Sequence, residues 1–324
     1  MAGWGLYFPG GSIRTKTKTK RSLSMKSAGA LRVVTCFVGS LLASHTYALE
    51  GGSSSYPAGT VTVMSGAVGA PGETHFYTYN KLIDIDSVRN NDGDKVFPKA
   101  KGRVHAHAIR VVHTLDGPKL LGGDVSLQAA IPYVKGHINI PALGPFERDS
   151  VSGIGDPMFG FLVSWVSANY LQNVDIELIE PWGKYDKNAL INAGNNSRAL
   201  YMAYAFTWFP MERVELSSKI SLNYSWENSD TDYKSGVQLV ADYGLNYRVT
   251  QSWLVGVGGF VSTQLNDDQS QGHNVGNRSR TTKIGPQVGY GTRDWGIVAA
   301  YQNDIYSRNA SEGDTIMLNG FLKY

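Results

Sequence analysis

Three histidines in a short stretch are the residues best placed for metal chemistry. His105 and His107 are separated by one residue, and His113 follows six residues later. On a β-strand these side chains share one face, with the first two roughly 6–7 Å apart. Two such imidazoles hold a metal only if a neighbouring strand supplies a further ligand. We expect histidines of a polar wall and assign no metal site.

Nucleophilic catalysis has no local signature in this chain. A Gly-x-Ser-x-Gly elbow is missing, and no histidine lies in a motif that orders a serine beside it. P-loop, paired-cysteine and EF-hand motifs are missing too. We therefore predict no catalytic residue and no cofactor, and we do not expect an enzyme. A hydrolase whose site forms only in the folded chain stays as an alternative.

Five charged residues alternate with apolar neighbours, so that charge and apolar surface fall on opposite faces of a strand. In residues 214–226 the apolar face is Val214, Leu216, Ile220, Leu222, Tyr224 and Trp226, and in residues 237–247 it includes Leu239, Tyr243, Leu245 and Tyr247. The charges on the polar faces are Asp175, Glu177, Glu215, Lys219 and Asp242.

Aromatic residues mark the apolar faces of these strands. Tyr224, Trp226, Tyr243 and Tyr247 are placed like the aromatic girdles that flank the lipid-facing band of a transmembrane barrel. The last ten residues alternate in the same way and end on Tyr324. A final strand of this kind is typical of outer-membrane barrels, and we expect the barrel-assembly machinery to recognise Tyr324.

The composition and the recurring short alternating runs predict one all-β domain. Glycine is frequent at 37 residues, and tyrosine, at 18, exceeds phenylalanine, at 11. We expect an antiparallel transmembrane β-barrel over residues 74–324, with about 12 strands and 10–14 as the range. A lipid-facing cation would cost roughly 2–4 kcal/mol at the bilayer midplane, so the five charges should face the lumen. There they either line a water-filled path or pair and close the interior.

The amino end reads as a leader that is removed. Within residues 1–48 we expect a Sec signal peptide with its true start at Met25 and cleavage after Ala48. This leader holds seven of the 30 Lys and Arg, no acidic residue, and the single cysteine, Cys36. The mature chain then carries 23 basic against 27 acidic residues, which removes the support for nucleic-acid binding.

Residues 49–73 differ from the rest of the chain. They begin rich in Gly and Ser and become apolar at residues 61–68. Such a segment would be unusually hydrophobic for a periplasmic tail. Two interpretations stay open, a plug tucked into the lumen and a flexible lead into the first strand.

Several short stretches, in this order and spacing, resemble the outer-membrane family described as involved in the meta-pathway of phenol degradation. They are Glu50-Gly51-Gly52, Gly155-Asp156-Pro157, residues 181–186, Asn192-Ala193-Gly194-Asn195-Asn196, residues 231–236, Lys283-Ile284-Gly285-Pro286 and Arg308-Asn309-Ala310. The resemblance spans most of residues 50–324. It implies an outer-membrane channel distantly similar to the hydrophobic-substrate channels.

The sequence thus favours a bacterial outer-membrane channel for passive uptake of small hydrophobic or aromatic compounds. The expected partners are outer-membrane lipid, the barrel-assembly machinery and these solutes. Aromatic side chains near the extracellular rim would capture a solute, which then diffuses through the lumen or its wall. Neutralising Glu215, Lys219 and Asp242 should then change conductance or selectivity. The alternatives are a closed structural or surface-interaction barrel and an outer-membrane hydrolase.

Overall fold

The computed structural model describes residues 56–97 and 99–324. The expected leader, its start at Met25, its cleavage point after Ala48 and the Glu50-Gly51-Gly52 stretch lie outside the described residues. Among the described residues, no helix is both long and apolar enough to cross a membrane.

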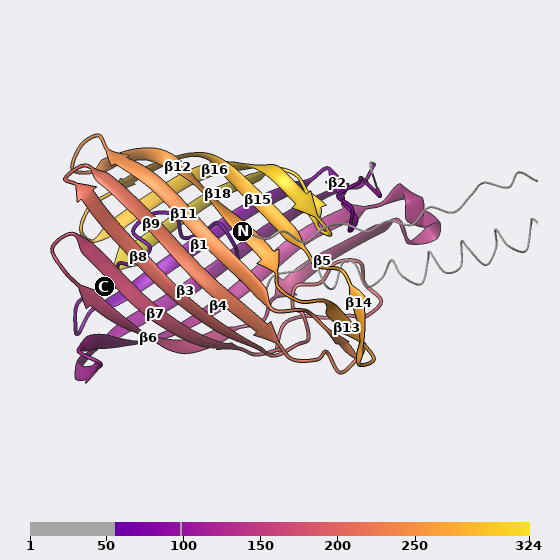
Figure 1. Ribbon diagram of the computed structural model, residues 1–324, viewed down its shortest axis with the longest axis horizontal. Helices are drawn as coiled ribbons and strands as arrows, with labels where there is room; N and C mark the ends of the chain where they lie inside the picture. Colours follow the sequence, from indigo (N-terminus) through magenta and orange to yellow (C-terminus); the bar gives the residue numbers. More distant parts are fainter. Residues whose placement is uncertain (1–55, 98) are drawn as a thin grey trace, which may run out of the picture. The chain divides into compact units, whose positions relative to one another are not determined.

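The described chain forms a closed antiparallel barrel with twelve wall positions (Figure 1). Each wall strand pairs with the next along the chain, and the last pairs with the first through nine residue pairs from His75–Lys323 to Ile83–Thr315. The predicted all-β fold of about twelve strands is confirmed. The wall strands are β1 (Thr74–Ile85), β3 (Lys101–Leu120), β4 (Gly123–Asn139), β6 (Met158–Val166), β7 (Tyr170–Ile179), β8 (Ala199–Met211), β9 (Val214–Ser225), β11 (Gln238–Arg248), β12 (Trp253–Gln264), β15 (Arg280–Gly291), β16 (Trp295–Arg308) and β18 (Thr315–Lys323).

One wall position is shared by two strands. The first half of β4 pairs with β6, and its second half pairs with β5 (Arg148–Ile154). Gly155-Asp156-Pro157 separates β5 from β6, opposite Pro132 of β4. Neither proline has an N–H to donate, so the ladder is interrupted here. The Asp156 carboxylate instead accepts hydrogen bonds from the backbone N–H groups of Gly183 and Asn195, at 2.9 and 2.6 Å.

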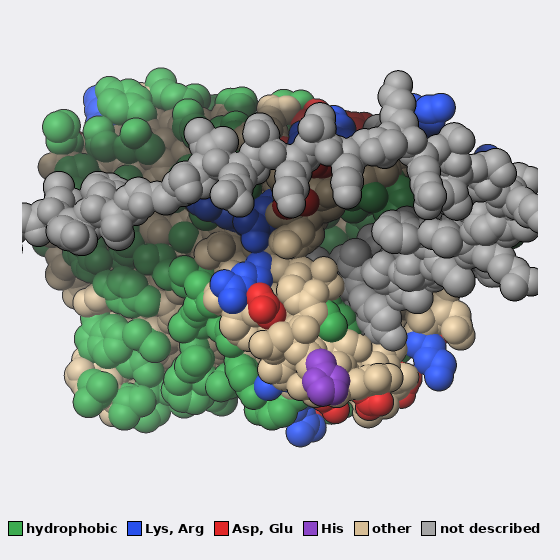
Figure 2. Space-filling view, turned by 45° about the vertical axis from the view of Figure 1, so that its right-hand side comes forward, with side chains coloured by type: hydrophobic (Ala, Val, Ile, Leu, Met, Phe, Trp, Pro, Cys, Tyr) green, Lys and Arg blue, Asp and Glu red, His purple; other side chains and the backbone are tan. Residues whose placement is uncertain are grey.

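The wall is apolar outside and polar inside. Ile220, Leu245 and Val257 are each about half exposed on the outer surface, with relative exposures of 43%, 56% and 45%. The neighbouring positions on the same strands, such as Ser221 and Asn246, are buried. Figure 2 shows hydrophobic side chains gathered over the barrel wall, with polar and charged side chains at the loop end. A water-soluble protein has the opposite distribution of apolar and polar side chains. This distribution is therefore that of a barrel surrounded by lipid.

The two ends of the barrel differ in their connections. One end, where β1 begins and β18 ends, has only short turns at residues 121–122, 167–169, 212–213, 249–252 and 292–294. The other end carries the long loops. Outer-membrane barrels place short turns in the periplasm and long loops outside, which orients the molecule. The small elements of the loop end are β2 (Ser87–Val88), the 3₁₀ helix η1 (Pro141–Phe146), β10 (Tyr233–Lys234), β13 (Asp268–Ser270), β14 (His273–Gly276) and β17 (Ser311–Glu312).

Candidate functional site: the barrel lumen

The N-terminal segment, residues 56–73, lies inside the barrel. Its backbone and side chains bond to side chains of the inward faces of many wall strands. From the middle of the lumen the segment descends to the short-turn end, where β1 begins at Thr74. The wall residues that bond to it include Lys81, Thr114, Asn173, Thr207, Glu215, Asp242, Asn246, Gln287, Gln302 and Asn319.

Asp242 of β11 holds the start of this segment. Its fully buried carboxylate accepts the backbone N–H groups of Gly59 and Val61, at 2.7 and 3.2 Å, and the Tyr56 hydroxyl at 3.3 Å. A buried charge needs such partners to offset its lost hydration. The segment therefore supplies the donors that make a carboxylate tolerable here.

Glu215 of β9 plays the same part closer to the short-turn end. Its carboxylate accepts the backbone N–H of Met64 at 2.8 Å and the Arg248 guanidinium at 3.0 Å. Asn246 of β11 donates to Glu215 and also to the carbonyl oxygen of Thr62, both at 3.2 Å. Two carboxylates thus bind the first half of the segment through backbone N–H groups of residues 59–64.

Glycine allows the segment and the wall to approach closely. A Cβ on Gly244 of β11 would lie 1.9 Å from the carbonyl oxygen of Thr62, and one on Gly66 would lie 2.2 Å from the carbonyl oxygen of Leu171. Both separations are far below van der Waals contact. Any larger residue at either position would push the segment away from the wall.

A charged cluster lies beside these contacts, because Lys219 of β9 is the direct ladder partner of Asp242. The Lys219 ammonium is 2.9 Å from Asp175, and the Arg110 guanidinium is 3.6 Å from the same carboxylate. Glu177 is buried two residues along the same strand. The rings of Tyr56 and Tyr201 stack at 4.9 Å, and the Lys219 ammonium lies 5.3 and 5.1 Å from their centroids. The cluster therefore also packs against the segment.

All five charged residues singled out in the sequence are buried, at 0–4% exposure, and they lie among inward-facing side chains. One cluster contains Asp175, Glu177 and Lys219. The other two residues, Asp242 and Glu215, bind the N-terminal segment. Only Lys219 and Asp175 bridge directly among the five. Their part in conductance or selectivity stays a prediction.

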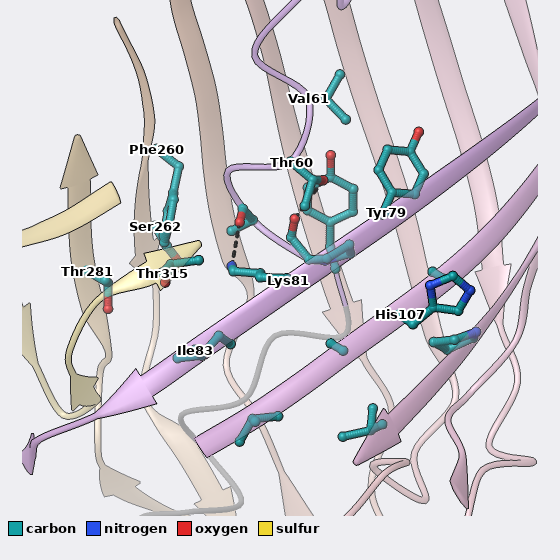
Figure 3. Close-up of a pocket in the computed structure, with 18 of the residues that line it drawn as sticks. Thr60, Val61, Tyr79, Lys81, Ile83, His107, Phe260, Ser262, Thr281 and Thr315 are labelled. Carbon is teal, nitrogen blue, oxygen red and sulfur yellow. Dashed lines mark hydrogen bonds between the residues drawn. The ribbon is translucent and has the colours of Figure 1, made fainter. Parts of the chain in front are cut away.

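A cavity of about 410 Å³ remains between the N-terminal segment and the long loops. Its floor is the segment, from Tyr56 to Val61, and its walls come mainly from β1, β3, β4, β12 and β15 (Figure 3). Apolar and aromatic side chains such as Ile83, Val104 and Phe260 line it together with charged ones. A mostly apolar space with a few fixed polar groups is the usual form of a small-molecule site.

The four aromatic candidates do not form one rim. Tyr224 and Trp226 meet edge-on at 5.3 Å at the loop end of β9, and the Lys234 ammonium lies 4.7 Å from the Tyr224 ring. Tyr243 lies within the wall, where its hydroxyl donates to the carbonyl oxygen of Lys283. Tyr247 is near the short-turn end of β11. The set therefore spans both ends of the wall.

The three histidines of β3 do not gather around a point. His107 bonds to Asn80 at 2.7 Å and His113 bonds to Thr74 at 2.9 Å, both across to β1. Within the described residues no group of three or more His, Cys, Asp or Glu side chains could hold a metal ion.

The long loops are fastened by their own ion pairs. Glu312 of β17 accepts hydrogen bonds from Arg89 at 3.1 and 2.8 Å and lies 3.2 Å from the Lys95 ammonium. The Arg89 guanidinium lowers the pKa of Glu312 to about 2. This carboxylate therefore stays ionised in mild acid and keeps the loop that carries β2 joined to the one that carries β17.

Several residues of the lumen were missed in the sequence. They are Lys81, Arg110, Gln287 and Tyr201. Lys81 and Arg110 lie on strands that mix polar and apolar residues. Only the period-two alternation of β1 and β3 could have indicated that these two side chains face inward. The Gln287 amide accepts a hydrogen bond from Thr62, 225 residues away in the chain, which no local sequence pattern indicates.

Comparisons with known proteins agree on family and fold. The family model described as "Putative MetA-pathway of phenol degradation" matches residues 85–320. The crystal structure of the COG4313 outer membrane channel from Pseudomonas putida F1 is similar, with a TM-score of 0.69, 18% identity, and coverage of 81% of this chain and 98% of that one. The CymD monoaromatic hydrocarbon channel matches at a TM-score of 0.43, with 10% identity over 82% and 97% of the two chains. These two structures are channels rather than enzymes. A search of the curated proteins found no match.

Proposed function

Because this chain belongs to the family of the putative MetA-pathway of phenol degradation, we propose that it is an outer-membrane channel for passive uptake of small hydrophobic or aromatic compounds. The family match covers most of the chain, and the barrel fold is that of an outer-membrane channel. No energy source or cofactor enters this proposal. The chain acts as a conduit rather than as an enzyme.

The cavity above the N-terminal segment is the observation that carries the proposal. Its volume of about 410 Å³ falls within the roughly 300–1,000 Å³ of small-molecule sites. Loop residues Asn192, Asn195 and Ala310 border it on one side and the segment closes it on the other. A solute entering from the loop end would stop at the segment. We propose that the segment is a plug that must shift for passage.

The surroundings that this function needs are the outer membrane and its assembly apparatus. The exposed apolar wall matches a lipid partner, since such a surface would be unfavourable in water. The side chain of Tyr324 is 90% exposed beyond the end of β18, and its backbone N–H bonds to the carbonyl oxygen of Thr74 at 2.9 Å. We propose that the barrel-assembly machinery recognises this terminus before β18 and β1 close the barrel.

Single-channel recording of the refolded mature protein in a planar bilayer tests the proposal. The intact protein should give small, intermittent currents that a small aromatic solute reduces by occupying the cavity. A variant that lacks residues 50–69 should give larger and steadier currents, because the wall hydrogen bonds close without the segment. Heat-modifiable migration in gels would show that both barrels are folded.

Three results would contradict the proposal. Silence from both folded barrels would favour the closed structural barrel. Currents that stay the same when aromatic solutes are added would show an open pore that does not bind the proposed class of substrate. Labelling of a serine by a phosphonate probe would favour the hydrolase instead.

A further inference from the structure

The four cations that line the cavity are not equally matched by carboxylates. Lys219 and Arg110 share Asp175, and Lys283 lies 2.8 Å from Asp304. Lys81 of β1 is different. Among the described residues no carboxylate oxygen lies within 4.0 Å of its ammonium.

Lys81 is held only by weaker partners. Its ammonium donates to the carbonyl oxygen of Ala58 at 2.7 Å, drawn as the dashed line in Figure 3, and lies 5.2 Å from the centroid of the Phe260 ring. The side chain is only 9% exposed. Two carboxylates lie farther off, Asp242 and Asp304, and both have other donors. Gly59, Val61 and Tyr56 donate to Asp242, and Lys283 and Gly313 donate to Asp304. A buried ammonium that faces a cavity with one carbonyl partner can accept an anion.

A second polar group near Lys81 lacks a partner. The Thr315 hydroxyl of β18 is fully buried, lines the cavity and has no hydrogen-bond partner among the described residues. Thr315 pairs with Ile83 and Met317 pairs with Lys81, so Thr315 is the diagonal neighbour of Lys81 on the inward face. Thr315, Phe260 and Ser262 are all among the residues that line the cavity (Figure 3). A buried hydroxyl without a partner is costly unless a ligand supplies one.

Apolar side chains also line this corner. Ile83 lies two residues from Lys81 on the same face of β1, and Val104 of β3 is its direct partner across the ladder. Phe260 completes the corner from β12. A flat apolar body fits against these side chains while one charged end reaches the ammonium.

We propose that this corner recognises the carboxylate of a small aromatic acid, with Lys81 binding the carboxylate and Thr315 donating a second hydrogen bond. The proposal rests on the channel function above and names its substrate class. One unmatched cation suits a monoanion rather than a phosphate. The bound carboxylate would compete with the Ala58 carbonyl for Lys81. Binding would thereby release one contact that holds the N-terminal segment.

Titration calorimetry on the refolded mature protein tests the assignment with benzoate and its neutral isostere benzamide. Benzoate should bind about 10- to 100-fold more tightly, as expected for a charge-assisted hydrogen bond. Lys81→Met should remove this preference and leave benzamide binding unchanged. Lys81→Arg should retain most of it. Lys187→Met, an exposed loop lysine, is the matched control and should behave as the unaltered protein does.

The failures can be told apart. Benzamide binding equal to or tighter than benzoate binding would overturn the carboxylate assignment while leaving a channel for neutral aromatics. Equal loss of both ligands in Lys81→Met, with a folded barrel, would make Lys81 a structural residue and would also overturn it. Binding of neither ligand to the unaltered protein would contradict the assignment and the proposed function together.

Discussion

At the scale of single residues, carboxylates in the lumen bind the backbone of the N-terminal segment. Asp242 and Glu215 accept N–H groups from residues 59–64, whereas a pore lined for conduction would leave such carboxylates to water. The sequence indicated that these side chains belong on polar faces, because alternation has a period of two. It left two roles open for them, lining a water-filled path or pairing with each other. It could not indicate that they bind backbone N–H groups of the N-terminal segment, because these partners lie about 150–180 residues away in the chain.

Asp242→Asn tests this role directly. The amide keeps one acceptor oxygen but presents an N–H₂ group to donors, so at least one of the bonds from Gly59 and Val61 is lost. We expect a cost of about 1.5–3 kcal/mol to segment attachment, which raises the open fraction by about 10- to 100-fold. Single-channel open probability measures it.

Asp230→Asn makes the same chemical change on an exposed loop and should leave the open probability unaltered. If Asp242→Asn and Asp230→Asn gave the same open probability, Asp242 would not hold the segment.

At the scale of elements, the wall and the segment are specified differently. The alternating runs that the sequence shows at residues 214–226, at 237–247 and in the last ten residues form β9, β11 and β18, because lipid outside and polar groups inside impose alternation on every wall strand. By contrast, the sharing of one wall position by β5 and β6 was not predicted, since it depends on two prolines that meet only across the ladder.

An engineered disulfide can fix the segment to the wall. A Cβ on Gly258 of β12 would lie 3.0 Å from the Cβ of Thr62, and a disulfide needs about 3.5–4.5 Å. A shift of less than about 1 Å, with the end of the Gln287 side chain moving aside, would admit the bond in Thr62→Cys/Gly258→Cys. Oxidation should abolish the intermittent currents, and a reductant should restore them.

The single variant Thr62→Cys is the control, and it should not respond to the redox state. The mature chain has no other cysteine, because Cys36 belongs to the expected leader. Currents that persist in the fully oxidised double variant would show that passage does not require the segment to move.

At the scale of the whole molecule, a closed hydrogen-bonded wall carries stability, and the lumen is left for function. No backbone edge faces lipid between β18 and β1, which is the condition for a barrel to span a membrane. The class of the molecule could be read from the sequence because this condition acts on the entire chain. The shape of the cavity could not be predicted from the sequence, because it depends on how the N-terminal segment passes the inward side chains of many strands.

Uptake across an intact outer membrane tests most directly whether this barrel passes aromatic solutes. Cells that produce the chain, cells that lack it and cells that produce the oxidised Thr62→Cys/Gly258→Cys variant would be given a radiolabelled aromatic solute at low concentration. We predict an initial uptake rate several-fold higher with the unaltered chain than without it. With the locked variant, the rate should be near that of cells lacking the chain. Equal rates in all three, with equal amounts of folded barrel in the outer membrane, would contradict this prediction.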